Sequence, residues 1–173
     1  RRILEERGID VRTKVTPTTE NDGRTSILKL VHPQKETETM PYDECLWCTG
    51  AKAPKFLAER TPFECTDVSG FIKVKATFES VSHPNVFAAG DCADNVDFPR
   101  PKAGVFAVRA GPPLLQNLIA ALTGKPLIPH RPQTQFLSLI STGDEYAVAS
   151  RGPWVFEHRY LWKLKDHIDR RWM

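Results

Sequence analysis

The sequence predicts an α/β fold, and three observations lead to this prediction. An apolar run at residues 86–90 is typical of a short buried strand, and a long helix is expected at about residues 103–122. Beyond Pro126, alternating strands and a terminal helix indicate a smaller α+β region. The chain has 173 residues, of which 40% are hydrophobic and 26% are charged. It is therefore long and apolar enough to bury a core in one or two compact domains.

The first region carries the end of a helix and several short strands. The helix end covers residues 1–7 and is closed by Gly8. Strands are expected at residues 11–15, 26–31, 36–40 and 44–48. A turn at Asn21-Asp22-Gly23 precedes the second of them. The Ala53-Pro54 pair ends this region.

Two further regions follow. The second holds the strand at residues 71–76 (FIKVKA), the loop at 80–85, the strand at 86–90 and the long helix, which begins after Pro101 and ends before Gly124. The third opens with a connector stiffened by three prolines. It continues with strands at residues 135–141 and 145–150, joined by Thr142-Gly143-Asp144, and an amphipathic helix at residues 160–173.

Charge and hydropathy exclude some function classes. The net charge of +3 arises from 24 basic and 21 acidic residues that are mostly interspersed, which is too weak for a nucleic-acid-binding protein. No apolar run approaches the roughly 18 residues that a membrane span needs. No leader is visible, and the chain opens without Met, so we expect an N-terminally truncated sequence. A cytoplasmic location is the default expectation.

The four cysteines are too few and too irregular for a disulfide scaffold. Cys45 and Cys48 have the redox spacing C-x-x-C, but they lie in the apolar run ECLWC, which is typical of a buried strand. Residues three apart along a strand are about 10 Å apart and point to opposite faces, beyond the roughly 7 Å Cα separation that a disulfide allows. We therefore favour two core thiols over a redox pair.

Asp91 directly follows a strand that is otherwise apolar. In open α/β sheets, ligands bind beyond the carboxyl ends of strands, where Gly90 and Asp91 fall. Gly90 lets the backbone approach a ligand closely, and the Asp91 carboxylate can accept hydrogen bonds from sugar-type hydroxyls. The sequence from Lys102 through Ala103 and Gly104 to Val105 then opens a helix whose free amides can donate to a carbonyl or an anion.

Three segments carry a family resemblance. Residues 70–93, GFIKVKATFESVSHPNVFAAGDCA, are similar to the second flavin motif of the FAD-dependent pyridine nucleotide-disulfide oxidoreductases. Within this family, the resemblance is to the group like type II NADH dehydrogenases. Residues 45–54, CLWCTGAKAP, are similar to that family's strand ending in Thr-Gly, with Cys48 where Ala is usual. The end of the chain, from residue 136, resembles the flavoprotein domain fused to selenide, water dikinase (selenophosphate synthetase).

The resemblance implies a fold and a domain organisation. The chain would be the C-terminal part of a flavoprotein with two Rossmann-like dinucleotide-binding domains, for FAD and NAD(P)H, plus a small α+β C-terminal domain. Residues 1–53 would be the C-terminal part of the NAD(P)H-binding domain, residues 54–126 would close the FAD-binding domain, and residues 127–173 would form a cap or interface. A complete member carries two Gly-x-Gly-x-x-Gly turns, and this sequence contains no Gly-x-Gly. We therefore expect the chain alone to be inactive.

The resemblance also implies a site and a reaction. Asp91 would hydrogen-bond the ribityl chain of FAD, and the amides of Ala103, Gly104 and Val105 would face the pyrimidine edge of the flavin ring. The remaining cofactor-binding residues implied are Thr49, Gly50, Gly90 and Lys102. Hydride would pass from NAD(P)H to the flavin, and the electrons would go on to an unknown acceptor. The candidate acceptors are a quinone, a protein and a selenium or sulfur species. The reaction would be linked to selenophosphate synthesis. No catalytic side chain or metal ligand is expected.

Two alternatives from other classes stay open. The C-terminal helix has Leu161, Leu164, Ile168 and Trp172 near one face and basic residues elsewhere, which would suit a module that docks a partner or lies on a membrane surface. A helix that covers the core is favoured, because Asp166 and Asp169 can pair with basic residues at helical spacing. The second alternative is a dithiol redox protein that uses Cys45 and Cys48.

Overall fold

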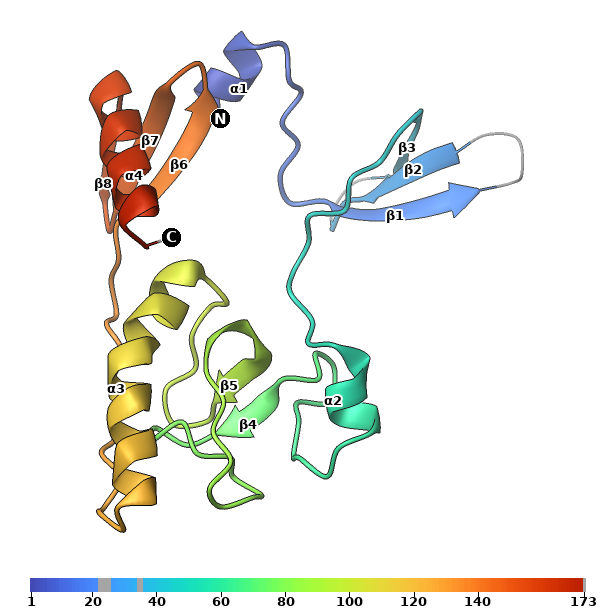
Figure 1. Cartoon of the computed structure of the whole chain (residues 1–173). Coiled ribbons are helices and arrows are strands. Elements are labelled where there is room, and N and C mark those ends of the chain that lie inside the picture. The colour runs from blue at the N-terminus through green and yellow to red at the C-terminus, as the bar shows by residue number, and fades with distance from the viewer. Residues whose placement is uncertain (22–25, 34–35, 173) are drawn as a thin grey trace. The chain divides into compact units, whose positions relative to one another are not determined.

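The computed structural model describes residues 1–21, 26–33 and 36–172. Its contacts divide the chain into two compact units, residues 1–49 and residues 50–173, and each is described by itself (Figure 1). The elements are mixed helices and strands, as the α/β prediction requires.

The first unit is a three-stranded antiparallel sheet with one short helix. The helix α1 spans Arg2–Glu6, and the strands are β1 (Thr16–Asn21), β2 (Ser26–Val31) and β3 (Glu38–Pro41), in the order β1-β2-β3. Thr16 pairs with Val31 at one end of the β1–β2 ladder, and Leu28 of β2 pairs with Met40. The predicted helix end and the strand at residues 26–31 are confirmed. The predicted Asn21-Asp22-Gly23 turn lies mostly outside the described residues.

Two strand predictions in this unit are wrong. Residues 11–15 form no strand, because Lys14 has a φ of 60° and this left-handed conformation interrupts an extended run. Residues 44–48 are also not a strand, since no neighbouring segment of the described chain offers them a backbone partner. The Leu46 side chain is accordingly 90% exposed, and Cys45 and Cys48 are exposed free thiols rather than core residues.

The second unit begins with a small parallel pair of strands. After helix α2 (Lys55–Glu59), strand β4 (Ile72–Val74) pairs in parallel with β5 (Ala93–Asn95), so that Ile72 lies opposite Ala93. A core cluster of Ile72, Val74, Ala88 and Ala93 forms around this pair. The predicted strand at residues 71–76 is thus confirmed in its central part.

The predicted strand at residues 86–90 is wrong in this structure. The segment makes one isolated antiparallel bridge, from Phe87 to Glu79, and the Ala88 amide donates to the Phe78 carbonyl at 3.0 Å. The parallel strand comes just after it, as β5, because residues 93–95 and not residues 86–90 pair with β4. Asp91 therefore lies in a single 3₁₀ turn, Gly90–Cys92, between the two segments.

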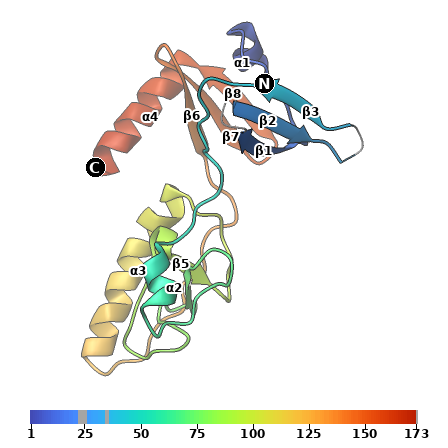
Figure 2. The same cartoon turned by 90° about the vertical axis from the view of Figure 1, so that its right-hand side faces the viewer.

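The long helix α3 spans Gly104–Leu122 and lies beside β5 in both views (Figure 1, Figure 2). It confirms the predicted helix, and Gly124 follows it with a φ of 67°. The sequence predicted no membrane-spanning segment. By length and composition alone, however, α3 is long and apolar enough to cross a membrane. This is weak evidence, because the core helix of a soluble protein passes the same test.

Asn117 joins α3 to the chain that follows it. Its side chain is fully buried, and its amide nitrogen donates to the carbonyls of Thr77 at 3.0 Å and Ile128 at 2.8 Å. Its amide oxygen accepts the backbone N–H of Ile128 at 2.8 Å. Two residues further on, the His130 amide donates to the Ala76 carbonyl at 2.9 Å. The connector with three prolines is thereby held against the loop that follows β4.

The last part of this unit is an antiparallel sheet with a helix. The strands β6 (Ser138–Gly143), β7 (Tyr146–Arg151) and β8 (Trp154–His158) lie in the order β6-β7-β8, and α4 spans Arg159–Trp172. The sequence predicted β6, β7 and α4 with shifted ends and missed β8.

Helix α4 contacts the central strand β7, whose Ala147 and Ala149 are buried. The predicted ion pairs at helical spacing form between Asp166 and Arg170, at 2.8 Å, and between Lys165 and Asp169. Leu164, expected on the apolar face, is instead 42% exposed.

Replacing Asn117 with alanine should destabilise the fold. The substitution removes a fully buried side chain and leaves one backbone amide and two backbone carbonyls without their partner, so we expect a loss of about 2–4 kcal/mol in the free energy of unfolding. Urea denaturation of Asn117→Ala measures this loss. The matched control is Gln116→Ala on the same helix, where the side chain is exposed. Equal midpoints for the two variants would contradict the role assigned to Asn117.

Candidate functional site

Gly90 begins the turn that carries Asp91. Its φ of 72° lies in the left-handed region, where a residue with a Cβ is strained. A Cβ added at this position would lie 3.5 Å from the Cβ of Ala107 on α3, which is ordinary contact. The backbone angle, rather than lack of space, is therefore what requires glycine here.

Asp91 presents an available carboxylate. The residue is exposed, and its side chain makes no hydrogen bond or ion pair within the part of the chain that the structure describes. A carboxylate with all its acceptor sites free can receive hydrogen bonds from the hydroxyls of a ligand. Its position is fixed by the backbone turn on one side and by α3 on the other.

Lys102 is held in place by the protein itself. Its ammonium donates to the Ala93 carbonyl at 2.6 Å and to the Asp94 carboxylate at 2.9 Å, and it lies 4.3 Å from the centre of the Phe71 ring. The side chain is only 17% exposed. Lys102 therefore ties the start of α3 to β5, and Asp94 compensates its charge.

The start of α3 lacks a side-chain cap. Ala103 occupies the N-cap position in an extended conformation, and its carbonyl accepts the Phe106 amide at 2.9 Å. Within the described part of the chain, no side chain caps the first amides of the helix. Uncapped amides at a helix start are suited to a carbonyl or anionic group of a ligand.

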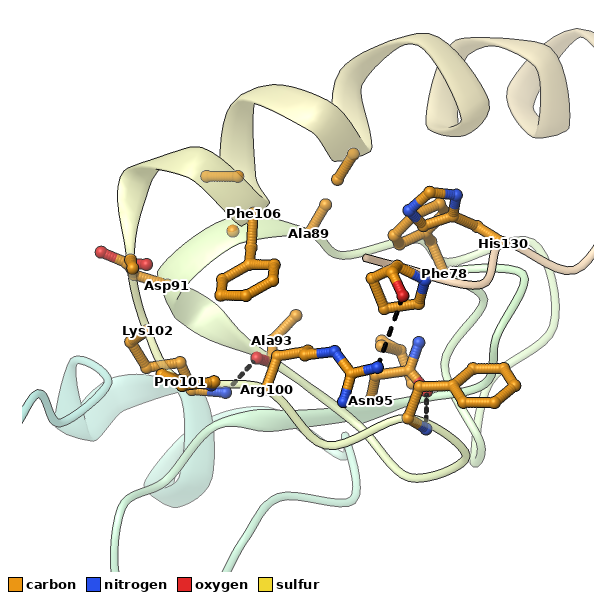
Figure 3. Close-up of a pocket in the computed structure, with 17 residues that line it drawn as sticks. Phe78, Ala89, Asp91, Ala93, Asn95, Arg100, Pro101, Lys102, Phe106 and His130 are labelled. Atoms are coloured by element: carbon orange, nitrogen blue, oxygen red, sulfur yellow. Dashed lines mark hydrogen bonds between the residues drawn. The ribbon is translucent and has the colours of Figure 1, made fainter. Parts of the chain in front are cut away.

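These groups lie around one open pocket. Its empty volume is about 560 Å³ when the adjoining solvent space is included. Small side chains line part of it, among them Ala89, Ala93, Ala103 and Ala107. In Figure 3, Asp91 and Lys102 lie toward one side of the pocket, His130 and Phe78 lie toward the other, and Phe106 lies between them.

The structure brings together part of the predicted site. Gly90, Asp91, Lys102 and Ala103 all line the pocket. Gly104 and Val105 do not line it, although they are the first residues of α3 next to Ala103. Gly50 is exposed and also lies outside the lining, and Thr49 belongs to the other unit. The ligand-binding role of each of these residues stays a prediction.

Sequence reasoning missed several residues that line the pocket. Phe78, Arg100, Phe106, His130 and Pro132 all line it. Phe106 was within reach of the sequence, because it lies one turn beyond Ala103 on a predicted helix. His130 comes from a connector whose prolines indicated only stiffness, and nothing in the sequence placed that connector beside Phe78.

His130 is packed as a neutral group. Its ring stacks on Phe78, with centroids 5.5 Å apart and planes at 24°. Burial lowers the pKa of His130 from its usual value of 6.5, because the charged form is poorly solvated there. The neutral form of His130 is therefore favoured in the pocket.

Two of the four cysteines lie in each unit. Cys65 and Cys92 of the second unit are partly buried, and burial raises the pKa of Cys65. Cys92 donates from its sulfur to the Ala89 carbonyl at 3.3 Å. Among the described residues, no three His, Cys, Asp or Glu side chains gather as a metal site would require.

Because residues 44–48 form no strand, the strand-based objection to pairing Cys45 with Cys48 does not hold.

The family model for pyridine nucleotide-disulphide oxidoreductases matches residues 1–117. The chain belongs to this family. Its fold is the C-terminal part of a Rossmann-like flavoprotein with a small α+β domain, as the sequence predicted.

A solved structure gives the same result for the fold. The sulfide:quinone oxidoreductase from the hyperthermophilic bacterium Aquifex aeolicus is similar over 98% of this chain, with a TM-score of 0.75 and 14% sequence identity. The chain spans 42% of the length of that protein. At this identity the likeness concerns the fold alone. None of the curated proteins matches the chain.

The pKa of His130 predicts a pH dependence of stability. A histidine whose pKa is lowered on folding binds its proton more readily in the unfolded chain, so protonation favours unfolding. The free energy of unfolding should therefore fall as the pH drops below about 6.5, and His130→Gln should lessen this fall. Urea denaturation from about pH 8 to pH 5 measures both proteins. Parallel pH profiles for the two would contradict the assignment, as would an NMR titration midpoint for His130 above 6.5.

Proposed function

We propose that this chain is the C-terminal portion of an FAD-dependent NAD(P)H oxidoreductase. The observation that carries the proposal is the unpartnered Asp91 carboxylate, set by the left-handed Gly90 on the rim of a pocket that ends at the uncapped start of α3. Membership of the pyridine nucleotide-disulphide oxidoreductase family supports the same cofactors. In this proposal residues 1–53 belong to the NAD(P)H-binding domain, residues 54–126 close the FAD-binding domain, and residues 127–173 form a cap or interface.

The residues of the pocket fit a flavin with its hydroxylated side chain. Asp91 accepts hydrogen bonds from the ribityl hydroxyls. Within the described part of the chain, no other donor bonds to this carboxylate. The small side chains along the pocket admit a planar ring, and Phe106 offers it an apolar contact. The amides of Ala103, Gly104 and Val105 donate to the electron-rich edge of the ring.

Bound FAD supplies the chemistry, by taking up a hydride and passing its electrons on. The protein's residues bind and orient. Asp91 fixes the ribityl chain, and the dipole at the start of α3 favours negative charge near the ring. Lys102 acts indirectly, because its ammonium is bound by Asp94 and the Ala93 carbonyl and holds the helix start at β5. Thr49 and Gly50 contribute a backbone approach near the cofactor.

Two narrower assignments follow from sequence resemblance. Residues 70–93 support a place near the type II NADH dehydrogenases, and the segment from residue 136 supports a link to selenide, water dikinase and hence to selenophosphate synthesis. The electron acceptor in this proposal is a quinone, a protein or a selenium or sulfur species. A cytoplasmic location accompanies the proposal, with α4 covering its sheet.

Removing the Asp91 carboxylate should weaken FAD binding in the full-length protein. A hydrogen bond to a charged group contributes about 1.5–3 kcal/mol, so Asp91→Ala should raise the Kd for FAD about ten- to hundredfold. Flavin fluorescence titration of the apoprotein measures the change. Glu59→Ala at the end of α2 is the matched control, since it removes one exposed carboxylate away from the pocket. An unchanged Kd for Asp91→Ala would remove Asp91 from the site.

The full-length protein should also purify with bound flavin that a nicotinamide reduces. Under anaerobic conditions, NADH or NADPH should bleach the visible absorption of the flavin, because hydride passes directly between the two rings. Comparing the two nucleotides in a stopped-flow spectrometer shows which one is the donor. Bound flavin that neither nucleotide bleaches, but that dithionite does, would refute the proposed reaction while leaving the FAD site intact.

A further inference from the structure

Strand β8 is an unprotected edge of its sheet. In the order β6-β7-β8 it is one of the two outer strands (Figure 1), and its residues Trp154–His158 pair with β7 in an unbroken register. The other outer strand, β6, has a register shift between Ser141 and Gly143. Folded proteins protect exposed edges with bulges, lysines or prolines, and β8 contains none of these. Of the two edges, β8 is therefore better suited to pair with another strand.

Three neighbouring side chains of β8 are apolar and exposed. Trp154, Val155 and Phe156 are exposed over 67%, 63% and 61% of their surface. The Trp154 and Phe156 rings stack, with centroids 6.4 Å apart and planes at 6°. Phe156 pairs with the buried Ala149 of β7, and facing residues of a ladder share one face of the sheet. The apolar surface of this face therefore continues from the covered centre of the sheet to its outer edge.

The sequence of β8 can pair with itself. Two antiparallel copies keep their faces aligned only if the register changes by two residues at a time. One register pairs all five residues of β8, and it sets Phe156 opposite Phe156 of the second copy, Trp154 opposite His158, and Val155 opposite Glu157. A shift of two residues in either direction pairs only three residues, and one of these shifts sets Glu157 opposite Glu157. Length and charge therefore both favour the full register, in which no like charges face each other.

The backbone of β8 also fits this register. Two residues, Gly152 and Pro153, form the turn between β7 and β8. The residues that flank such a turn face each other as a hydrogen-bonded pair, and the backbone groups then point alternately to the two sides of the strand. Phe156 thus directs its backbone groups at β7, and Val155 directs its own away from it. Phe156 would meet its counterpart as a non-hydrogen-bonded pair, in which the Cα atoms are about 4.5 Å apart.

We propose that β8 is the docking surface for a second copy of this chain, and that the two copies join edge to edge into one antiparallel sheet. The two-fold axis passes between the facing Phe156 residues, so that Trp154 of each copy packs against His158 of the other. Aromatic side chains bury about 150–250 Å² each, so covering the exposed part of these rings in both copies removes roughly 700–1,000 Å² from water. This area lies at the lower end of specific interfaces, and the dimer should therefore be weak and depend on protein concentration. The flavin pocket takes no part in the contact.

A cysteine at the proposed axis tests the register. In the full-length protein, Phe156→Cys should form an intermolecular disulfide on oxidation with diamide, because a Cα separation of about 4.5 Å lies within the range that disulfides allow. Val155→Cys is the matched control, since Val155 is equally exposed but faces Glu157 instead of its own counterpart. Non-reducing electrophoresis should show mainly disulfide dimer for Phe156→Cys. Val155→Cys should give no more dimer than the wild-type protein, whose own cysteines set the background.

Charge at position 155 tests the same contact without a crosslink. Val155→Glu places a carboxylate opposite Glu157 on both sides of the axis and should raise the dimer Kd about tenfold, whereas Val155→Lys gains an opposite charge there and should retain the dimer. Sedimentation velocity of the full-length protein over a range of concentrations measures the Kd. Ile140→Glu on β6 is the control, because Ile140 is 57% exposed on the same face of the sheet at its other edge.

Several results would overturn the proposal. A wild-type protein that sediments as a monomer at every concentration would refute it without any variant, so misfolding of a variant does not leave the question open. Equal disulfide yields for Phe156→Cys and Val155→Cys would indicate random collisions. Equal weakening by Val155→Glu, Val155→Lys and Ile140→Glu would show only a loss of apolar surface. A monomer that binds phosphatidylglycerol vesicles, and loses this binding in Val155→Glu, would assign the strand to a membrane surface. A monomer whose Phe156→Cys thiol resists thiol reagents would assign the edge to another segment of the full-length chain.

Discussion

The fully buried Asn117 is the interaction on which the pocket depends most. One amide group on α3 satisfies two carbonyls and one N–H from the loop after β4 and from the connector after the helix. A polar side chain in such a position is stable only when all its partners are present. Its geometry therefore specifies where the connector runs, and the connector in turn supplies His130 and Pro132 to the pocket wall.

The ionisable residues that line the pocket are held in different ways. At one end Asp91 is negative and unpartnered, while Lys102 is neutralised by Asp94 and serves to anchor the helix start. At the other end Arg100 keeps its charge, and His130 favours its neutral form because burial lowers its pKa. A flavin whose hydroxyls reach Asp91 would find a complementary charge there.

Much of the site was predictable because it depends on short-range sequence features. An apolar run that ends in Gly90 and Asp91 lies about ten residues before a helix start at Lys102 and Ala103. Sequence patterns report such local chemistry well. The strand at residues 86–90 failed for a different reason. Its apolar composition predicts a strand, but strand formation needs a backbone partner, and in this structure β4 pairs with residues 93–95 instead. The same dependence on a partner removed the predicted strand at residues 44–48.

The sequence by itself determined the α/β class, the long helix, the Gly90–Asp91 turn and the resemblance to the family, because these follow from local periodicity, backbone preference and motif. Only the tertiary structure decided that the Lys102 ammonium is bound by Asp94, that Phe78 and His130 stack, and that Arg100 keeps an unpaired donor. Each of these is a contact between residues separated along the chain. Such contacts arise from packing and from the geometry of buried hydrogen bonds, which composition and spacing do not encode residue by residue.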